Sequence, residues 1–170
     1  MQKQEIKEIN LLNRAIEVRR NIISSEEHNM EFVAEIDSVT FINDSISFSV
    51  NTTKQSLENI HSPVILIIGG FDINSDYSVL SEIIKKKTKA VVYLGKENEK
   101  IIKFCKSKDS MLFASAVSLQ ESVEIAFRYA TAGNAVLFSP ACACGKEFTD
   151  YKIRGKEFKN MVNALSKVKN

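Results

Sequence analysis

The 170-residue sequence has no long apolar run and almost no excess of either charge. Its apolar runs fall well short of the roughly 18 to 20 residues that a membrane-spanning helix needs, and Met1 to Glu8 lack the apolar core of a signal peptide. The 23 Lys and Arg residues against 21 Asp and Glu leave a net charge of +2, far from the basic excess typical of nucleic-acid-binding proteins. We therefore expect a cytoplasmic protein with no membrane span and no nucleic acid partner.

Cysteine is also scarce, and its pattern argues against disulfides and bound metal ions. The three cysteines, Cys105, Cys142 and Cys144, are odd in number and do not form a secreted disulfide framework, so we expect reduced thiols. The spacing of Cys142 and Cys144 is Cys-x-Cys, which differs from the usual Cys-x-x-Cys of zinc fingers. A nucleophilic Cys144 would need a neighbouring base, and the sequence places neither histidine beside it. We predict no metal site and no catalytic residue.

The chain contains 44% hydrophobic residues, enough for one full core. Apolar side chains between Glu5 and Ser24 recur at helical spacing, and the polar run from Ser24 to Asn29 follows as a linker. We divide the chain into an N-terminal helix with its linker, residues 1–27, and a single domain, residues 28–170. The N-terminal helix is either a docking element for another protein or a helix packed on this domain. We favour the second interpretation.

The domain alternates predicted strands and helices. Continuous β-branched runs predict strands that are buried on both faces, as in a parallel sheet. The predicted strands are Met30–Ile36, Val39–Ile42, Val64–Ile68, Ala90–Leu94, the weaker Met111–Ala114 and Ala135–Phe138, and the predicted helices are Thr52–Asn59, Tyr77–Lys87, Glu97–Lys106, Ser118–Ala130 and Arg154–Val168. This order predicts a Rossmann-like, doubly wound α/β fold with a mostly parallel sheet and helices on both faces.

Three loops at the carboxyl ends of the predicted strands carry the residues best suited to binding a ligand. They are Asn43–Ser45, Gly69–Asp72 and Ser139–Gly145. We expect the three loops to meet at one edge of the sheet. Gly69 and Gly70 would let the backbone approach a ligand closely, while Asp44 and Asp72 offer acceptors for a ribose hydroxyl, an amine or a basic side chain. The same residue types are ordinary turn residues, so loops without a ligand remain the alternative interpretation.

At these loops the sequence resembles a known family. The matching segments are Glu31–Ser45, Pro63–Asp72, Ala90–Gly95 and Val136–Ala143, followed by Arg154, Gly155 and Phe158. In order and spacing they resemble the C-terminal domain of the Mur ligases, and within that family the UDP-N-acetylmuramoyl-L-alanine:D-glutamate ligases of bacterial peptidoglycan synthesis. The resemblance covers about residues 28–165. It implies a Rossmann-like domain that closes over a central ATP-binding domain and helps to hold nucleotide and D-glutamate during ATP-dependent amide formation.

Several positions depart from the family pattern where that pattern has cationic or hydroxyl side chains. Two family lysines are replaced by Ile46 and Ile73, a threonine by Phe48, an arginine by Asn29 and a serine by Cys144. Each charge-assisted hydrogen bond is worth roughly 1.5 to 3 kcal/mol, so the loss of three cations should remove several kcal/mol of transition-state stabilisation. The phosphate-binding motif Gly-x-x-x-x-Gly-Lys-[Ser/Thr] is absent as well.

We interpret the site residues as a vestigial ligand pocket. It comprises His28, Asn43, Asp44, Ser45, Gly69, Gly70, Asp72, Ser139, Cys144 and Tyr151. The isolated chain is expected to need no cofactor. ATP and Mg²⁺ are expected only when a separate central domain completes the ligase.

Three functional hypotheses follow from the resemblance and its departures. The first is a stand-alone pseudoenzyme that binds another protein, with a Mur-ligase-like chain as one candidate partner. The second is the C-terminal part of a split D-glutamate ligase. The third is a small-molecule sensor that uses Asp44, Asp72 and the Gly-Gly turn for a neutral or cationic ligand. The apolar replacements Ile46, Phe48 and Ile73 favour the first hypothesis, because an apolar patch suits a protein partner better than a charged ligand.

Overall fold

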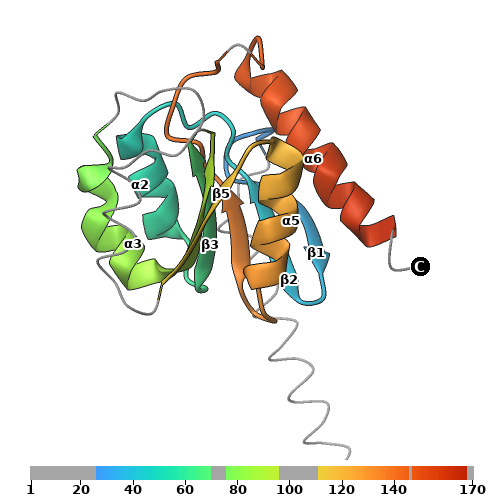
Figure 1. Cartoon of the computed structure of the whole chain (residues 1–170), viewed down its shortest axis with the longest axis horizontal. Coiled ribbons are helices and arrows are strands. Elements are labelled where there is room, and N and C mark those ends of the chain that lie inside the picture. The colour runs from blue at the N-terminus through green and yellow to red at the C-terminus, as the bar shows by residue number, and fades with distance from the viewer. Residues whose placement is uncertain (1–25, 70–75, 96–110, 146, 168–170) are drawn as a thin grey trace, which may run out of the picture.

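The computed structural model describes residues 26–69, 76–95, 111–145 and 147–167 (Figure 1). The strands are β1 (Glu31–Ile36), β2 (Val39–Asn43), β3 (Val64–Gly69), β4 (Thr88–Leu94), β5 (Leu112–Ala116) and β6 (Ala135–Phe138), and the helices are α2 (Val50–Asn59), α3 (Ser81–Lys87), α5 (Leu119–Tyr129) and α6 (Tyr151–Lys167), with a 3-10 turn, η1 (Tyr77–Leu80), before α3. Every predicted strand is confirmed, and the predicted helix Tyr77–Lys87 divides into η1 and α3. The predicted helices Glu5–Ser24 and Glu97–Lys106 lie outside the described residues.

The six strands form one sheet in the order β1-β2-β6-β3-β4-β5. β1 and β2 pair antiparallel as a hairpin, and the other neighbouring strands pair parallel. α2 and α3 lie on one side of the sheet, and α5 and α6 lie on the other (Figure 1). This arrangement confirms the predicted doubly wound α/β fold.

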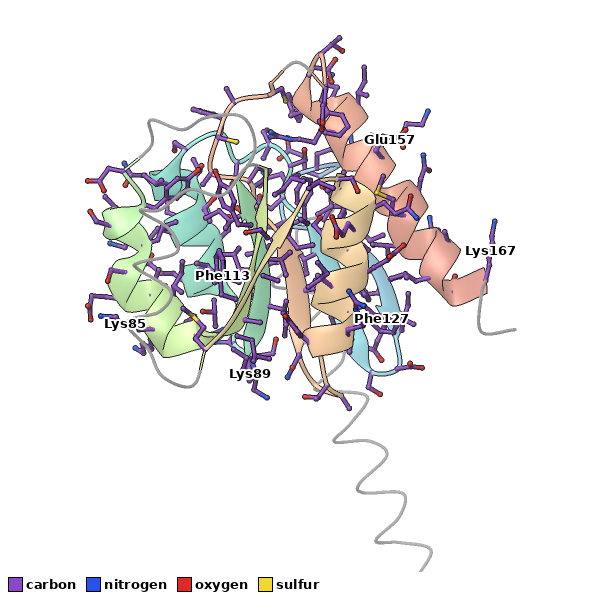
Figure 2. The ribbon with its side chains drawn as sticks, in the orientation of Figure 1. Lys85, Lys89, Phe113, Phe127, Glu157 and Lys167 are labelled. Atoms are coloured by element: carbon purple, nitrogen blue, oxygen red, sulfur yellow. The ribbon has the colours of Figure 1, made fainter. Side chains whose placement is uncertain are left out.

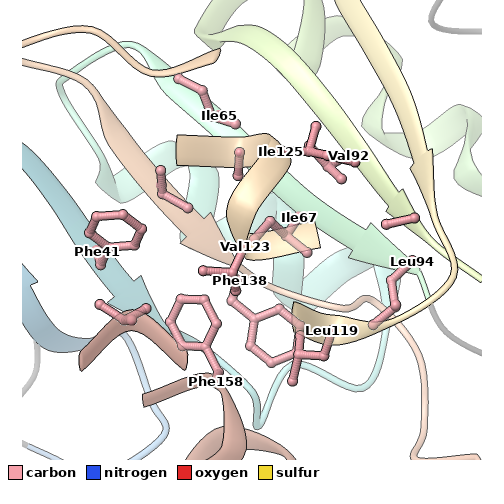
Figure 3. Packing of buried hydrophobic residues seen from close by; sticks show 14 of the residues in the cluster. Phe41, Ile65, Ile67, Val92, Leu94, Leu119, Val123, Ile125, Phe138 and Phe158 are labelled. Carbon is pink, nitrogen blue, oxygen red and sulfur yellow. The ribbon is translucent and has the colours of Figure 1, made fainter. Parts of the chain in front are cut away.

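Buried apolar side chains cover both faces of the sheet. On the side of α5 and α6, the rings of Phe138 and Phe158 stack with centroids 4.9 Å apart (Figure 3). On the other side, Leu57 of α2 and Leu80 of η1 are fully buried against the sheet. Charged side chains such as that of Lys167 project outward from the elements (Figure 2). β3 is buried along its whole length, which explains its continuous apolar sequence.

Polar residues determine where two helices begin. The hydroxyl of Ser118 accepts a hydrogen bond from the backbone N–H of Glu121 at 3.1 Å, which caps α5. α6 begins at Tyr151, three residues earlier than predicted. The reason is Asp150, whose carboxylate accepts hydrogen bonds from the backbone N–H groups of Lys152 and Ile153 at 2.7 and 2.9 Å. These bonds satisfy N–H groups that have no partner inside the helix.

Candidate functional site at the carboxyl edge of the sheet

The loops that follow β2, β3 and β6 meet at the carboxyl edge of the sheet, as predicted. The backbone N–H of Asp44 donates to the carbonyl of Phe138 at 2.9 Å, and that of Ser139 donates to Ile67 at 3.1 Å. The N–H of Gly69 donates to the carbonyl of Pro140, also at 2.9 Å. Gly70, Asp72 and Ile73 of the second loop lie outside the described residues.

Asp44 lies at the centre of this edge and is 1% exposed. One carboxylate oxygen accepts hydrogen bonds from the hydroxyls of Ser47, Ser56 and Ser139 at 2.6, 2.6 and 2.7 Å, and the other accepts from the backbone N–H of Met30 at 3.2 Å. Burial raises the pKa of Asp44, although these hydrogen bonds act against the rise. The carboxylate therefore ties α2, the loop after β6 and the chain before β1 to the end of β2.

A second polar network at this edge surrounds His28 and Asn43. The side-chain amide of Asn43 donates to Glu31 at 2.9 Å and lies 2.9 Å from Nδ1 of His28. Because the amide nitrogen is a donor, this contact fits a neutral imidazole that accepts at Nδ1. Burial is the main reason that the pKa of His28 is lowered. The ring of Tyr151 meets the imidazole edge-on, with centroids 6.1 Å apart.

An ion-pair cluster joins this network to α6. Lys159 contacts the carboxylates of Glu27 and Glu31, the latter at 3.0 Å. Burial acts to lower the pKa of Lys159, but the two carboxylates outweigh it and the pKa is raised. The hydrogen bond from Lys159 lowers the pKa of Glu27. Lys159 is thus engaged by acidic side chains of its own domain.

Gly155 allows α6 to approach the His28 network. A Cβ atom at this position would meet Nδ1 of His28 and lie 3.0 Å from the amide nitrogen of Asn43.

We expect Gly155→Ala to lower the free energy of unfolding by about 1 to 3 kcal/mol, as overpacking typically does. In an unobstructed helix the same change would stabilise by about 1 kcal/mol. Urea denaturation measures the difference, with the exposed Lys156→Ala as the control, and a more stable Gly155→Ala protein would contradict the close approach.

Arg154 is a buried cationic residue that the predicted pocket omitted. It is 4% exposed, and its guanidinium donates to the carbonyl and the hydroxyl of Ser45 at 2.7 and 3.1 Å and to the carbonyl of Cys142 at 3.3 Å. The hydroxyl of Ser45 in turn donates to the carbonyl of Tyr151 at 2.8 Å. The sequence signal that could have identified Arg154 was its place among the residues that resemble the family. The described hydrogen bonds of Arg154 hold the loop after β6 against the loop after β2.

Cys144 lies in the loop after β6 and is partly exposed. Burial raises the pKa of its thiol, and the charge of Arg154 opposes that rise. A raised pKa lowers the thiolate fraction at neutral pH, so this thiol is not activated as a nucleophile. Within the described residues, no group of three or more His, Cys, Asp or Glu side chains is arranged to hold a metal ion.

A cavity of about 260 Å³ opens at this edge beside the start of α2. Its lining consists of Asn29, Met30, Asp44, Ile46, Ser47, Phe48, Thr52, Gln55, Ser56 and Asn59. Three of the substituted family positions, Asn29, Ile46 and Phe48, therefore face one cavity. None of these described lining residues carries a positive charge, and Phe48 is 66% exposed.

Searches with protein-family models find no match for this sequence. Among solved structures, the chain is similar to the murein peptide ligase Mpl of Psychrobacter arcticus, with a TM-score of 0.53 and 11% sequence identity. That similarity covers 79% of this chain and 30% of the other. No described helix is long and apolar enough to cross a membrane. The fold is that of the Mur ligase C-terminal domain.

Sequence relatives make the assignment more specific. The chain is 36% identical over 156 residues to a UDP-N-acetylmuramoylalanine–D-glutamate ligase of Porphyromonas gingivalis, covering 92% of this chain and 34% of that protein. It is 40% identical over 139 residues to the ligase of the same name from Cytophaga hutchinsonii, covering 82% of this chain and 31% of that protein. The chain is a homologue of these D-glutamate ligases and spans about a third of their length.

Proposed function

We propose that this chain acts by binding another protein and does not form amide bonds by itself. The cavity beside α2 carries the proposal. Asn29, Ile46 and Phe48 converge there, and the described lining offers no positive side chain. A transferring phosphoryl group or a substrate carboxylate needs such charges for its stabilisation. This lining supports a chain that needs no ATP or Mg²⁺ by itself, and those cofactors are expected only with a separate ATP-binding domain.

The partner that we propose is a Mur-ligase-like chain, a D-glutamate ligase of the same organism. The homologues of this chain are about three times as long, so the matching region works in those proteins as part of a larger chain. Phe48, exposed at the mouth of the cavity, supplies an apolar side chain of the kind that anchors protein interfaces. Such a partner uses nucleotide-linked precursors, so we expect the complex in the cytoplasm.

Binding is tested with the full chain and the D-glutamate ligase of the same organism by isothermal calorimetry. We expect a stable complex that Phe48→Ser weakens at least about tenfold, equivalent to 1.4 kcal/mol. Leu112→Ser is the matched control, because Leu112 is 50% exposed at the opposite edge of the sheet, at the start of β5. Circular dichroism verifies that both variants fold. Absence of a complex, or equal weakening by both substitutions, would overturn the proposal.

A second candidate is the C-terminal part of a split D-glutamate ligase. The observation that favours it is the preserved strand-end network, in which Asn43, Asp44 and Arg154 join the loops with buried hydrogen bonds. The test mixes this chain with a D-glutamate ligase lacking its own C-terminal third, and supplies ATP, Mg²⁺, UDP-N-acetylmuramoylalanine and D-glutamate. We expect no phosphate release above either protein alone. Release and amide formation that require both chains would establish the split ligase instead.

A further inference from the structure

A second, mostly apolar groove lies over β2, on the side of α2. Its volume is about 260 Å³, and it is lined by Met30, Thr40, Ile42, Asn59, Ile60, His61, Ser62, Pro63, Gly133 and Ala135. These residues come from the chain before β1, from β2, from the end of α2 and the loop that follows it, and from the start of β6 and the chain just before it. The groove therefore runs from the carboxyl edge of the sheet to its amino edge, on the side of α2.

This side of the hairpin is incompletely covered by the described elements. α6 is the only described helix with extensive contacts to β1 and β2, and it packs on the opposite face with Phe41 and Ile36. Ile42 faces the α2 side, and its cross-strand neighbour Phe32 is 36% exposed. Directly opposed residues of an antiparallel pair share one face, so Phe32 extends the apolar surface beside the groove. A sheet face of this composition is normally covered by another element.

We propose that residues 1–24 of the same chain form that element and pack their apolar side into the groove. The described chain begins at Glu26, only four residues before Met30, which lines the groove. The segment therefore enters beside the surface that it covers. In a helix, Ile9, Leu12, Ile16 and Ile23 would lie on one side, while Lys7, Arg14 and Asn21 would lie on the other together with Val18.

Length and charge agree with this occupant. A helix over the 20 residues Glu5 to Ser24 would be about 30 Å long. The five-residue strand β2, which underlies the groove, extends about 17 Å. Residues 1–24 contain five Lys and Arg against three Glu, and the exposed Glu35 lies opposite Thr40 at the rim. A helix somewhat longer than half of this segment would span the strand, and the positive charge of the segment suits the carboxylate of Glu35.

Disulfide trapping tests the contact in the full chain after Cys105, Cys142 and Cys144 are replaced by serine. Ser62→Cys at the groove is paired in turn with Leu12→Cys, Ile16→Cys and Ile23→Cys, and with Lys7→Cys and Arg14→Cys as controls from the opposite side of the helix. We expect disulfides within one molecule, at least about ten times faster for the best apolar position than for either control. Equal rates at all positions, or disulfides only between two molecules, would overturn the proposal.

A second measurement avoids replacing the cysteines. Ile16→Lys and Ile23→Lys should each lower the melting temperature by about 4 °C or more, an ordinary response to losing one buried apolar side chain in a chain of this size. Asn10→Lys and Asn21→Lys, on the opposite side of the helix, should change it by less than about 1 °C. Thr40→Lys, in the groove, should lower the melting temperature by itself. Adding Ile16→Lys to the Thr40→Lys variant should then lower the melting temperature very little further. Unchanged melting temperatures for the two isoleucine variants would show that the segment does not pack on its own domain.

Discussion

Asp44→Ala is expected to lower the free energy of unfolding by about 3 to 5 kcal/mol, which is at the upper end for single substitutions. The change removes the acceptor for three buried hydroxyls, those of Ser47, Ser56 and Ser139, and for the N–H of Met30. Ser56 and Ser139 keep their contacts with the Thr52 carbonyl and the Thr53 hydroxyl, so the loss falls mainly on Ser47 and Met30. Each buried polar group left without a partner costs about 1 to 3 kcal/mol. Urea denaturation followed by circular dichroism measures the loss. Asp44→Asn keeps an acceptor for Met30 and should cost less than half as much.

The pH dependence of stability gives an independent check on Asp44. Its pKa is raised in the folded protein by burial, so the folded state holds a proton that the unfolded state releases near pH 3.9. The part of the stability that depends on this proton is therefore complete below about pH 3.9 and is lost as the pH rises through the raised pKa. The Asp44→Asn variant has no such proton and should not show this decline. Identical pH profiles for the wild-type chain and the Asp44→Asn variant would contradict the assignment.

Arg154→Met is expected to lower the free energy of unfolding by about 2 to 4 kcal/mol, because the carbonyls of Ser45 and Cys142 lose charge-assisted hydrogen bonds in a buried place. The same change should release the loop after β6. The buried thiol of Cys142 should then react with a thiol reagent at least about tenfold faster, which corresponds to 1.4 kcal/mol less protection.

Arg154→Lys separates the charge of this residue from its geometry. Lysine keeps the positive charge, but its single ammonium group lacks the planar set of donors with which the guanidinium reaches Ser45 and Cys142 at the same time. We expect it to recover less than half of the lost stability and to leave the Cys142 thiol more reactive than in the wild-type chain. Full recovery by lysine would mean that charge alone holds the loops, which would contradict the forked arrangement.

The sheet could be predicted from the sequence because its signals are local. The continuous apolar runs of β3, β4 and β6 reflect burial on both faces, and Asp37 with Ser38 marks the hairpin turn. The start of α6 was missed because the capping role of Asp150 depends on its backbone geometry. The meeting of the three loops followed from the parallel topology alone, and the described parts confirm it.

The internal partners of the site residues could not be predicted in the same way. Asp44 belongs to a residue type that is common in ligand-binding turns. The hydroxyls that donate to its carboxylate come from residues that are 3, 12 and 95 positions away in the sequence. Only the folded chain shows that both carboxylate oxygens accept bonds from the protein itself. Arg154 lies 109 residues from Ser45, and no spacing rule connects the two. The roles of the remaining pocket residues in binding stay predictions.

The position of β6 in the sheet has a consequence for how the chain folds. β6 separates β2 from β3, although it is the last of the described strands. A nascent chain can form the β1–β2 hairpin early and the β3–β4–β5 unit later. These two parts of the sheet cannot join until residues 135–138 have left the ribosome, because β6 pairs with both. Such non-local pairing slows folding, because loop-closure entropy is lost before the contacts form. We expect refolding to end in one slow phase in which β6 inserts between the preformed β1–β2 hairpin and the preformed β3–β4–β5 unit.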